Sequence, residues 1–285
     1  MKKVLVTGAK GQLGRCIKDA AINFPFLEIN FVSRKDLDID DFDAVQQFFN
    51  QHKFDYCINA AAYTNVEKAE SDSDQAFLTN AEAVKNLANI CDFSKTTLLQ
   101  ASTDYVFNGK KESPYLEEDQ TNPINVYGAS KLKGEEYIQE SGVDYFIFRT
   151  SWLYSQHGHN FLNTILKYGK EGKLLTITTE QVGVPTNAND LALALLDVIV
   201  SDNSEYGTYN FSNSGKATWF DFAKAIFEEN PQFDLSNLAK TDYYRTFAAR
   251  PKYSVLDTNK YKKTFNTKVI DWRESLSILI KLINF

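Results

Sequence analysis

The chain has 285 residues, 43% hydrophobic and 24% charged, enough for one large α/β domain or a domain with an appendage. Its net charge of −6 disfavours a sequence-independent nucleic-acid partner, and no apolar run is long enough to cross a bilayer. The apolar run between Lys3 and Gly8 is too short for a signal peptide. Cys16, Cys57 and Cys91 are widely separated and odd in number, which is typical of buried thiols in a reducing cytoplasm.

A glycine-rich turn lies between the first predicted strand and the first predicted helix. Residues 2–7 form a short β-branched and apolar run, typical of a buried parallel strand, and an amphipathic pattern begins at Leu13. Between them Gly8, Gly11 and Gly14 follow the spacing G-x-x-G-x-x-G. Glycines allow a tight turn and close approach of a pyrophosphate, which the free N–H groups of a helix start attract. We therefore expect a dinucleotide site here; the alternative is an ordinary strand-to-helix turn.

The end of the second predicted strand, at residues 28–32, indicates which dinucleotide is bound. An acid at this position would hydrogen-bond the adenosine ribose of NAD and repel a 2′-phosphate. Ser33 and Arg34 offer a hydroxyl and a guanidinium instead. This pair predicts a preference for NADPH, with NADH as the second candidate; the alternative is a solvated surface arginine. Asp38 and Ile39 are expected to border the adenine.

Strands and helices alternate through the first half of the chain. Further strands are predicted at residues 55–59, 97–102 and 145–149, and helices at about 42–52, 73–93 and 127–139. This alternation predicts a Rossmann-type α/β fold with a doubly wound parallel sheet, in which ligands lie beyond the carboxyl ends of the strands. The small residues Ala60, Ala61 and Ala62 follow the third strand and would leave room for such a ligand.

The predicted division of labour separates a cofactor part from a substrate part. Residues 1–150 are expected to form the NADP-binding domain, rejoined by about 184–212, because the apolar helix predicted at 190–200 would pack on the main sheet. Residues 151–285 would form a smaller, discontinuous C-terminal part that binds the substrate. Its predicted elements are helices at about 160–168, 219–229 and 271–283 and a strand at 174–178.

Tyr127 and Lys131 are spaced four residues apart near the start of a predicted helix. This spacing places the phenol and the ammonium on one helical face. The cation would favour the phenolate and lower the pKa of the tyrosine from its ordinary value of about 10. Such a tyrosine can exchange a proton with a carbonyl or carbinol oxygen. The alternative, a chance pair on a surface helix, is disfavoured because the glycine turn, Ala62, Thr103 and Tyr127 all follow predicted strand ends.

Four motifs occur in order along the chain: Thr7-Gly8-x-x-Gly11-x-x-Gly14, Asn59-Ala60-Ala61, Ser102-Thr103 and Tyr127-x-x-x-Lys131. In these motifs the chain resembles the extended short-chain dehydrogenase/reductase family. Further stretches resemble those members of the family that make dTDP-L-rhamnose: NAAAYTNVEKAE (59–70), STDYVF (102–107), NVYGASK (125–131), FRTSWLY (148–154), GVPT (183–186) and Ala249-Arg250-Pro251. Together these stretches span nearly the whole chain.

The resemblance implies that NADPH reduces C4 of dTDP-4-dehydro-6-deoxy-L-mannose, giving dTDP-L-rhamnose for cell-surface polysaccharides. It implies that Tyr127 protonates O4, that Thr103 hydrogen-bonds the same oxygen, and that Lys131 lowers the pKa of the tyrosine while holding the nicotinamide ribose. Asp104 and the flat face of Trp152 would contact the sugar, and Arg250 the nucleotide end. Gly11, Gln12, Leu13, Asp38, Ile39, Ala62, Tyr63, Thr64 and Ala101 would line the cofactor, beside Gly8, Gly14, Ser33 and Arg34.

No metal site is expected. Some relatives dimerise through a metal held by acids, one of them just after the glycine motif, but Arg15 and Cys16 occupy that region here. A homodimer without metal stays open. His157 and His159 form a His-x-His pair with no evident third ligand.

Two other functions compete with the reductase. One is a sugar-nucleotide dehydratase or epimerase of the same fold. Dehydratases of the family carry an acid pair after the threonine, and here Tyr105 follows Asp104, so half of the pair is missing. The other is a non-catalytic, reductase-like regulatory subunit. The intact Thr103, Tyr127 and Lys131 count against it.

Overall fold

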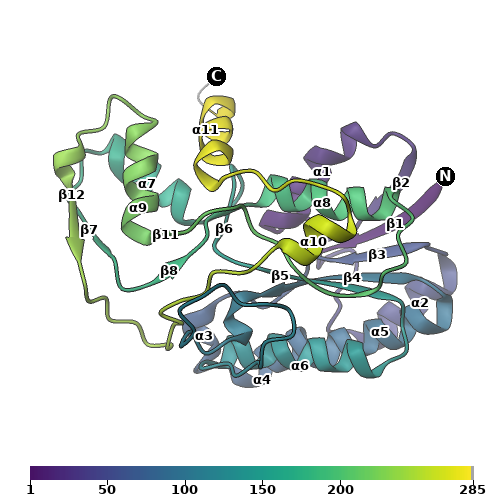
Figure 1. Cartoon of the computed structure of the whole chain (residues 1–285). Coiled ribbons are helices and arrows are strands. Elements are labelled where there is room, and N and C mark those ends of the chain that lie inside the picture. The colour runs from purple at the N-terminus through teal and green to yellow at the C-terminus, as the bar shows by residue number, and fades with distance from the viewer. Residues whose placement is uncertain (284–285) are drawn as a thin grey trace.

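The larger part of the protein is a parallel sheet with helices on both faces, in a computed structural model that describes residues 1–283 (Figure 1). Six strands lie in the order β10-β5-β4-β3-β1-β2. They are β1 (Lys2–Thr7), β2 (Leu27–Phe31), β3 (Tyr56–Asn59), β4 (Thr97–Thr103), β5 (Tyr145–Thr150) and β10 (Gly207–Asn210). Every neighbouring pair is parallel, so the predicted Rossmann-type, doubly wound sheet is confirmed.

The strand order reverses direction between β1 and β3. Thr7 at the end of β1 lies opposite Asn59 at the end of β3, and the Thr7 hydroxyl donates to the Asn59 side chain at 2.6 Å. The chain leaves these two neighbouring strands toward opposite faces of the sheet, which opens a crevice beyond their carboxyl ends. The glycine turn and residues 60–62 lie at that crevice.

Helices cover the sheet because the strands are apolar on both faces. One face carries α2 (Phe42–Gln51), α5 (Ala83–Ser94) and α6 (Val126–Glu140), and the other carries α1 (Gln12–Ala20) and α8 (Ala188–Val200) (Figure 1). In α8, Leu191, Leu195 and Ile199 are fully buried in the same core cluster as Ile17 of α1. The helix predicted at 190–200 is therefore confirmed and packs on the main sheet. Strand β10, which follows it and pairs with β5, was not predicted.

The helix predicted at 73–93 is interrupted. It consists of α4 (Ser73–Phe77), a π-helical turn η2 (Leu78–Glu82) and α5. A π turn inserts one extra residue into a helix, and such turns occur often at functional sites. Here it brings the Asn80 side chain to the backbone of Tyr63 and to the Ser130 hydroxyl of α6, at 2.9–3.0 Å. Asn80 thus ties the loop after β3 to α6.

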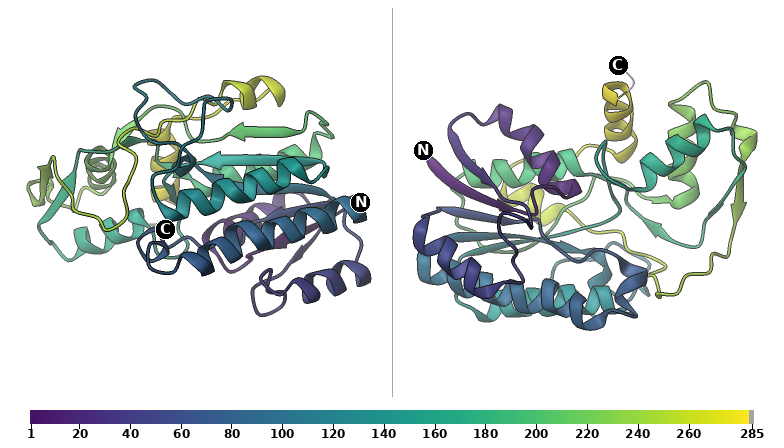
Figure 2. Two further views of the ribbon diagram at one scale, coloured as in Figure 1. Left: turned by 90° about the horizontal axis from the view of Figure 1, so that it is seen from below. Right: turned by 180° about the vertical axis from the view of Figure 1, so that it is seen from behind.

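A second lobe lies beyond one end of the sheet (Figures 1 and 2). It contains α7 (Phe161–Lys170), α9 (Trp219–Glu228), α11 (Trp272–Ile283) and the parallel pair β7 (Leu175–Thr178) and β12 (Leu238–Thr241). Its core includes Leu162, Phe222, Phe227 and Leu276. Thr218 caps α9 in a capping box with Asp221.

Short elements connect these parts. They are η1 (Ala21–Asn23), α3 (Val66–Ala69), η3 (Asp104–Val106), β6 (Leu153–Tyr154), β8 (Val182–Gly183), β9 (Thr186–Asn187), β11 (Ala217–Thr218), η4 (Leu235–Asn237) and α10 (Asn259–Thr264). Across residues 1–283, no helix combines the length and the hydrophobicity that crossing a membrane requires.

Candidate active site

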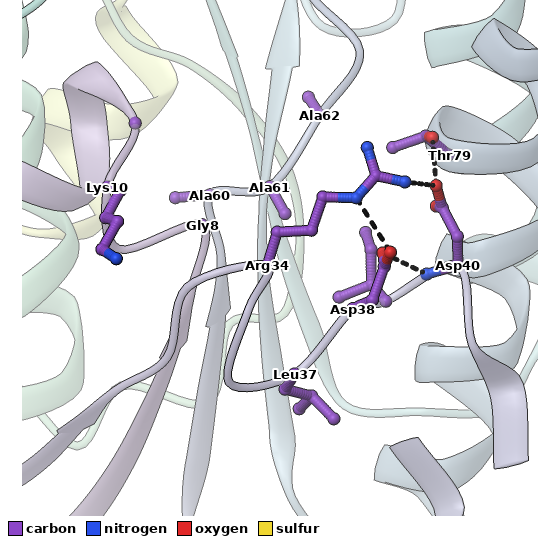
Figure 3. A pocket seen from close by; sticks show the side chains of 12 residues that line it. Gly8, Lys10, Arg34, Leu37, Asp38, Asp40, Ala60, Ala61, Ala62 and Thr79 are labelled. Atoms are coloured by element: carbon purple, nitrogen blue, oxygen red, sulfur yellow. Dashed lines mark hydrogen bonds and ion pairs between the residues drawn. The ribbon is translucent and has the colours of Figure 1, made fainter. Parts of the chain in front are cut away.

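A cavity of about 220 Å³ lies at the point where the strand order reverses (Figure 3). It is lined by Gly8, Lys10, Gly11, Arg34, Leu37, Asp38, Ile39, Asp40, Ala60, Ala61, Ala62 and Thr79. We call it the first cavity. Gly8 has φ of +65°, and a Cβ there would lie 2.6 Å from the backbone of Ala60; a Cβ on Gly14 would lie 2.4 Å from the carbonyl oxygen of Gly8. Only glycine fits these positions, so the turn is built for close backbone approach.

Arg34 lies beside the first cavity and is held by two acids (Figure 3). Its Nε donates to Asp38 at 2.8 Å and its Nη2 to Asp40 at 2.9 Å, while its side chain stays 69% exposed. The Ser33 hydroxyl donates to Asp36 at 2.6 Å and Ser33 does not line the cavity. Lys10 lines the opposite side and was missed, although it lies inside the glycine motif. The cation set for a phosphate is therefore Lys10 and Arg34.

The other residues predicted at the cofactor divide into two groups. Asp38, Ile39 and Ala62 line the first cavity. The Leu13 side chain is buried in the core, and Thr64 is exposed outside the cavity wall. Two more have identified roles near the site. Gln12 accepts from Asn160 at 3.1 Å, and the Tyr63 hydroxyl donates to Asp72 at 3.1 Å.

Tyr127 lies in the first turn of α6, close in space to Thr103 at the carboxyl end of β4. Asn125 caps this helix by accepting from the backbone N–H of Gly128 at 2.7 Å. Gly128 allows a close approach, because a Cβ there would lie 2.2 Å from the carbonyl oxygen of Tyr105. The Thr103 hydroxyl lies close enough to the Tyr127 phenol to lower the pKa of that phenol. The structure therefore brings Thr103 and Tyr127 together, as the sequence predicted.

Lys131 lies one turn further along α6 and is buried. Its Nζ donates to the carbonyl oxygen of Ala101, near the carboxyl end of β4, at 2.7 Å. Burial lowers the pKa of Lys131 to about 8, and the negative charge of Glu135 acts against this shift. Glu135 itself is held by Arg149 in a buried ion pair with an N–O distance of 2.7 Å, and it accepts from Ser102 at 2.5 Å.

The pKa of Tyr127 moves in the direction opposite to the one predicted. Burial raises it well above its ordinary value, and the Thr103 hydroxyl offsets only part of this shift. Lys131 does not produce the expected acidification, because its ammonium is bonded to Ala101 and is itself desolvated. The phenol is consequently protonated throughout the physiological range. A neutral phenol is the form that donates a proton to an oxygen that gains negative charge.

Asp104 is a buried carboxyl beside this cluster. One of its oxygens accepts from the Thr103 hydroxyl at 3.1 Å, and the other has no hydrogen-bond partner within residues 1–283. Burial raises the pKa of Asp104 to about 7, and the nearby hydroxyls of Ser254 and Thr103 act in the opposite direction. A buried carboxyl oxygen without a partner suits a ligand hydroxyl.

A larger cavity of about 490 Å³ opens on the second lobe. We call it the second cavity. Its wall combines aromatic, aliphatic and polar side chains: His159, Asn160, Phe161, Thr164, Ile165, Tyr168, Leu175, Thr176, Ile177, Thr178, Gln181, Trp219, Tyr244 and Arg250. Asn160 also donates to Gln12 of the glycine turn, so the second cavity lies next to the cofactor half of the crevice. Of this wall, only Arg250 was predicted.

Trp152 lies next to the wall of the second cavity, stacked on a residue of that wall. Its indole stacks on Trp219 with ring centroids 3.7 Å apart and an interplanar angle of 8°. One flat face is therefore covered by Trp219, which lines the second cavity in its place. A Cβ on Gly183 would lie 2.6 Å from the Trp152 ring, so the pair is also confined from the side of β8. The predicted contact of Trp152 with the sugar therefore concerns the face that is not stacked on Trp219, and it stays a prediction.

Within residues 1–283 no group of three His, Cys, Asp or Glu side chains could hold a metal ion. His157, the first member of the His-x-His pair, has its Nε2 2.5 Å from Asp19 of α1. This pair joins α1 to the loop before α7.

The chain is similar to known proteins along its whole length. The family model described as the RmlD substrate binding domain matches residues 1–284. A dTDP-4-dehydrorhamnose reductase from Aggregatibacter actinomycetemcomitans is 35% identical over 286 residues, which is 97% of each chain.

Solved structures agree with these sequence matches. The crystal structure of dTDP-4-dehydrorhamnose reductase from Bacillus anthracis in complex with NADP has a TM-score of 0.93 and 36% identity, covering 100% of this chain and 99% of that one. The crystal structure of a dTDP-4-dehydrorhamnose reductase from Clostridium acetobutylicum has a TM-score of 0.93 and 37% identity, covering 99% of this chain and 100% of that one.

Proposed function

The chain belongs to the RmlD substrate binding domain family, and from this premise we propose that it reduces the C4 ketone of dTDP-4-dehydro-6-deoxy-L-mannose to dTDP-L-rhamnose with NADPH. One observation carries the proposal. The Tyr127 phenol, which its surroundings keep protonated, lies beside Thr103 in the crevice beyond the strand ends. A dinucleotide-type glycine turn opens the first cavity on one side, and Arg250 of the second cavity is bonded to the neighbouring Tyr105 on the other.

The residues of the first cavity fit a nicotinamide dinucleotide. Gly8, Gly11 and Gly14 allow a pyrophosphate to approach the backbone at the start of α1. Lys10 and Arg34 would hold a 2′-phosphate. Asp38 and Asp40 reduce the net positive charge there, so we expect NADPH to be preferred by a modest factor and NADH to serve as a slower substitute.

The chain's own groups account for the proton side of the reaction. When bound, NADPH supplies the hydride. As C4 is reduced, its oxygen gains negative charge, and the Tyr127 phenol gives it a proton. Thr103 orients the phenol and the sugar oxygen, while Asp104 accepts from a sugar hydroxyl through its oxygen that lacks a partner. Lys131, bonded to Ala101, has further N–H groups for the nicotinamide ribose.

The same proposal assigns tasks to the parts of the chain. Residues 1–150 with about 184–212 would hold the cofactor, and the rest of residues 151–285 would hold the dTDP-sugar. We also infer a cytoplasmic location, which the buried free thiols Cys16, Cys57 and Cys91 support. A homodimer is part of the proposal, and light scattering of the purified protein tests it.

A screen of keto-sugar nucleotides with NADPH and NADH tests the proposed function. The expected result is consumption of NADPH with the 4-keto-6-deoxy-L-mannose nucleotide, faster than with NADH. Consumption with another keto-sugar nucleotide alone would change the substrate. A protein that purifies with tightly held, self-recycling NAD and consumes no reduced cofactor would favour the epimerase or dehydratase instead. Cofactor binding without turnover of any keto sugar would favour the regulatory subunit.

A further inference from the structure

Glu67 of α3 connects three residues of a distant loop. Its Oε1 accepts from Nη2 of Arg250 at 2.7 Å. Its Oε2 accepts from the backbone N–H groups of Phe247 and Ala248 at 2.8 and 3.1 Å. The carboxylate is 41% exposed and the Arg250 side chain 24%. An exposed ion pair alone contributes little, but a carboxylate that also binds two successive backbone amides fixes the course of the loop.

Arg250 connects Glu67 to Tyr105, which packs against Tyr127. Its Nη1 donates to the Tyr105 hydroxyl at 3.0 Å. The ring of Tyr105 meets the ring of Tyr127 edge to face, with centroids 5.8 Å apart and an interplanar angle of 77°. Arg250 also lines the second cavity. One guanidinium therefore touches both the wall of the substrate cavity and the residue that packs against the proton donor.

A second contact of the same segment reaches the same helix. Glu70, which follows α3, accepts from the backbone N–H of Val126 at 2.8 Å, one residue before Tyr127. From the other side, Asn125 donates to the carbonyl oxygen of Ala249 at 2.7 Å. The segment 66–70, the loop 247–250 and the start of α6 thus hold one another through side chain to backbone hydrogen bonds.

We propose that Glu67 is a positioning residue for the reduction, which orients Arg250 to bind the phosphates of the dTDP-sugar while Arg250 holds Tyr105 against Tyr127. This inference rests on the proposed function. The Nε–H of Arg250 is buried and has no hydrogen-bond partner within residues 1–283, so the guanidinium keeps a donor for a ligand. Arginine matches phosphate oxygens by geometry as well as charge, and Glu67 fixes the plane of the guanidinium.

The rival explanation is that Glu67 only stabilises the fold. A structural role would affect both cavities together, with a lower midpoint of unfolding. A positioning role affects the second cavity and leaves the first unchanged, because the contacts of Glu67 go to residues 247–250 and not to the wall of the first cavity.

A double-mutant cycle with dTDP as the probe separates these roles. Calorimetry would measure the dissociation constants of dTDP and NADPH for the wild type, Glu67→Gln, Arg250→Met and the double variant. Glu136→Gln is the matched control, because Glu136 is 43% exposed and pairs with Lys133 on α6. We expect Glu67→Gln to weaken dTDP binding about tenfold, the loss of one charged hydrogen bond. The double variant should bind no more weakly than Arg250→Met, and NADPH binding should stay within about twofold.

Each other outcome decides against the inference. Wild-type affinity of Glu67→Gln for dTDP, or losses that add in the double variant, would show that Glu67 does not act through Arg250. Equal losses of dTDP and NADPH binding would indicate a structural role. Glu67→Asp gives a second test: the retained charge with shorter reach should give a loss between wild type and Glu67→Gln. Failure of the wild type to bind dTDP also overturns the inference.

Turnover is measured separately, which keeps the two proposals distinct. A wild type that binds dTDP but reduces no keto sugar contradicts the proposed function, and the dTDP cycle still decides the role of Glu67. Where turnover occurs, Glu67→Gln should raise KM for the sugar nucleotide and also lower kcat, because Tyr105 loses its anchor. Glu136→Gln should change neither.

Discussion

The two cavities differ in which parts of the chain form their walls. Except for Thr79 of η2, the wall of the first cavity comes from the loops that follow β1, β2 and β3, within about ten residues of a strand end. The second combines α7, β7, Trp219, Tyr244 and Arg250, which are far apart in sequence and meet only through packing of the second lobe. Backbone positions that the sheet fixes cannot move to accommodate a substitution, whereas side chains that form a cavity wall can repack. Substitutions should therefore separate cofactor binding from substrate binding.

The largest effect is expected at Tyr127, which belongs to the reacting centre and to neither cavity wall. Tyr127→Phe removes the proton donor and should lower kcat by about 10²–10⁴-fold, the usual contribution of a general acid. The dissociation constants of NADPH and dTDP should stay within about threefold. Tyr137→Phe is the control on the same helix, since the Tyr137 hydroxyl donates to Glu82 at 3.0 Å, away from the reacting centre. Normal turnover by Tyr127→Phe would remove the assignment.

A substitution in the glycine turn should weaken cofactor binding in the first cavity. Gly8→Ala places a Cβ 2.6 Å from the backbone of Ala60 at φ of +65° and should weaken NADPH binding by about 100-fold or more, which is roughly 3 kcal/mol. Binding of dTDP should be unchanged, as calorimetry can measure. Gly142→Ala is a matched control, because Gly142 also has positive φ but a Cβ there meets nothing within 4 Å. A parallel loss of dTDP binding would contradict the separation.

The pH dependence tests the residue that joins the reacting centre to the cofactor. Lys131 is charged below its pKa of about 8 and neutral above it. The positive charge of Lys131, which holds the nicotinamide ribose, is thus fully present at lower pH and is lost as the pH rises. We therefore expect kcat/KM for NADPH to fall about tenfold per pH unit above pH 8. Lys131→Arg keeps the charge and should remove this limb. A profile that stays flat to pH 10 in the wild type would contradict it.

The smallest effect is expected in the wall of the second cavity. Gly183→Ala places a Cβ 2.6 Å from the Trp152 ring and should shift the Trp152–Trp219 stack. Because side chains can repack, we expect KM for the sugar nucleotide to rise only severalfold, about 1 kcal/mol, with NADPH binding unchanged. Tryptophan fluorescence should change as well. A change in NADPH affinity instead would show that the two cavities are coupled more tightly than their walls indicate.

The same contrast explains what the sequence could predict. Hydrophobic runs and the glycine spacing locate strand ends, and a parallel sheet brings strand ends to one edge, so the Rossmann-type fold and the positions of Gly8, Thr103 and Tyr127 follow. The family resemblance was confirmed by the comparisons. The wall of the second cavity depends on long-range packing, which no local pattern contains. Trp219 and its stack on Trp152 were therefore missed, and the contact of Trp152 with the sugar stays a prediction.

The predicted direction of the pKa shift of Tyr127 was wrong for a related reason. The i, i+4 spacing correctly places the phenol and the ammonium on one helix, but the shift depends on burial and on where the Lys131 ammonium finds an acceptor. The π turn at residues 78–82 was invisible for a similar reason: its extra residue is stabilised by contacts of Asn80 with Tyr63 and Ser130.

The most direct test of the account follows the hydride and the proton together. NADPH carrying deuterium at C4 of the nicotinamide would be incubated with the enzyme and the dTDP-4-keto-6-deoxy-L-mannose nucleotide, and the product examined by NMR. The account predicts one deuterium at C4 of dTDP-L-rhamnose in the wild type and almost no product from Tyr127→Phe at equal cofactor occupancy. Deuterium at another carbon, or labelled product formed at the wild-type rate by Tyr127→Phe, would contradict it.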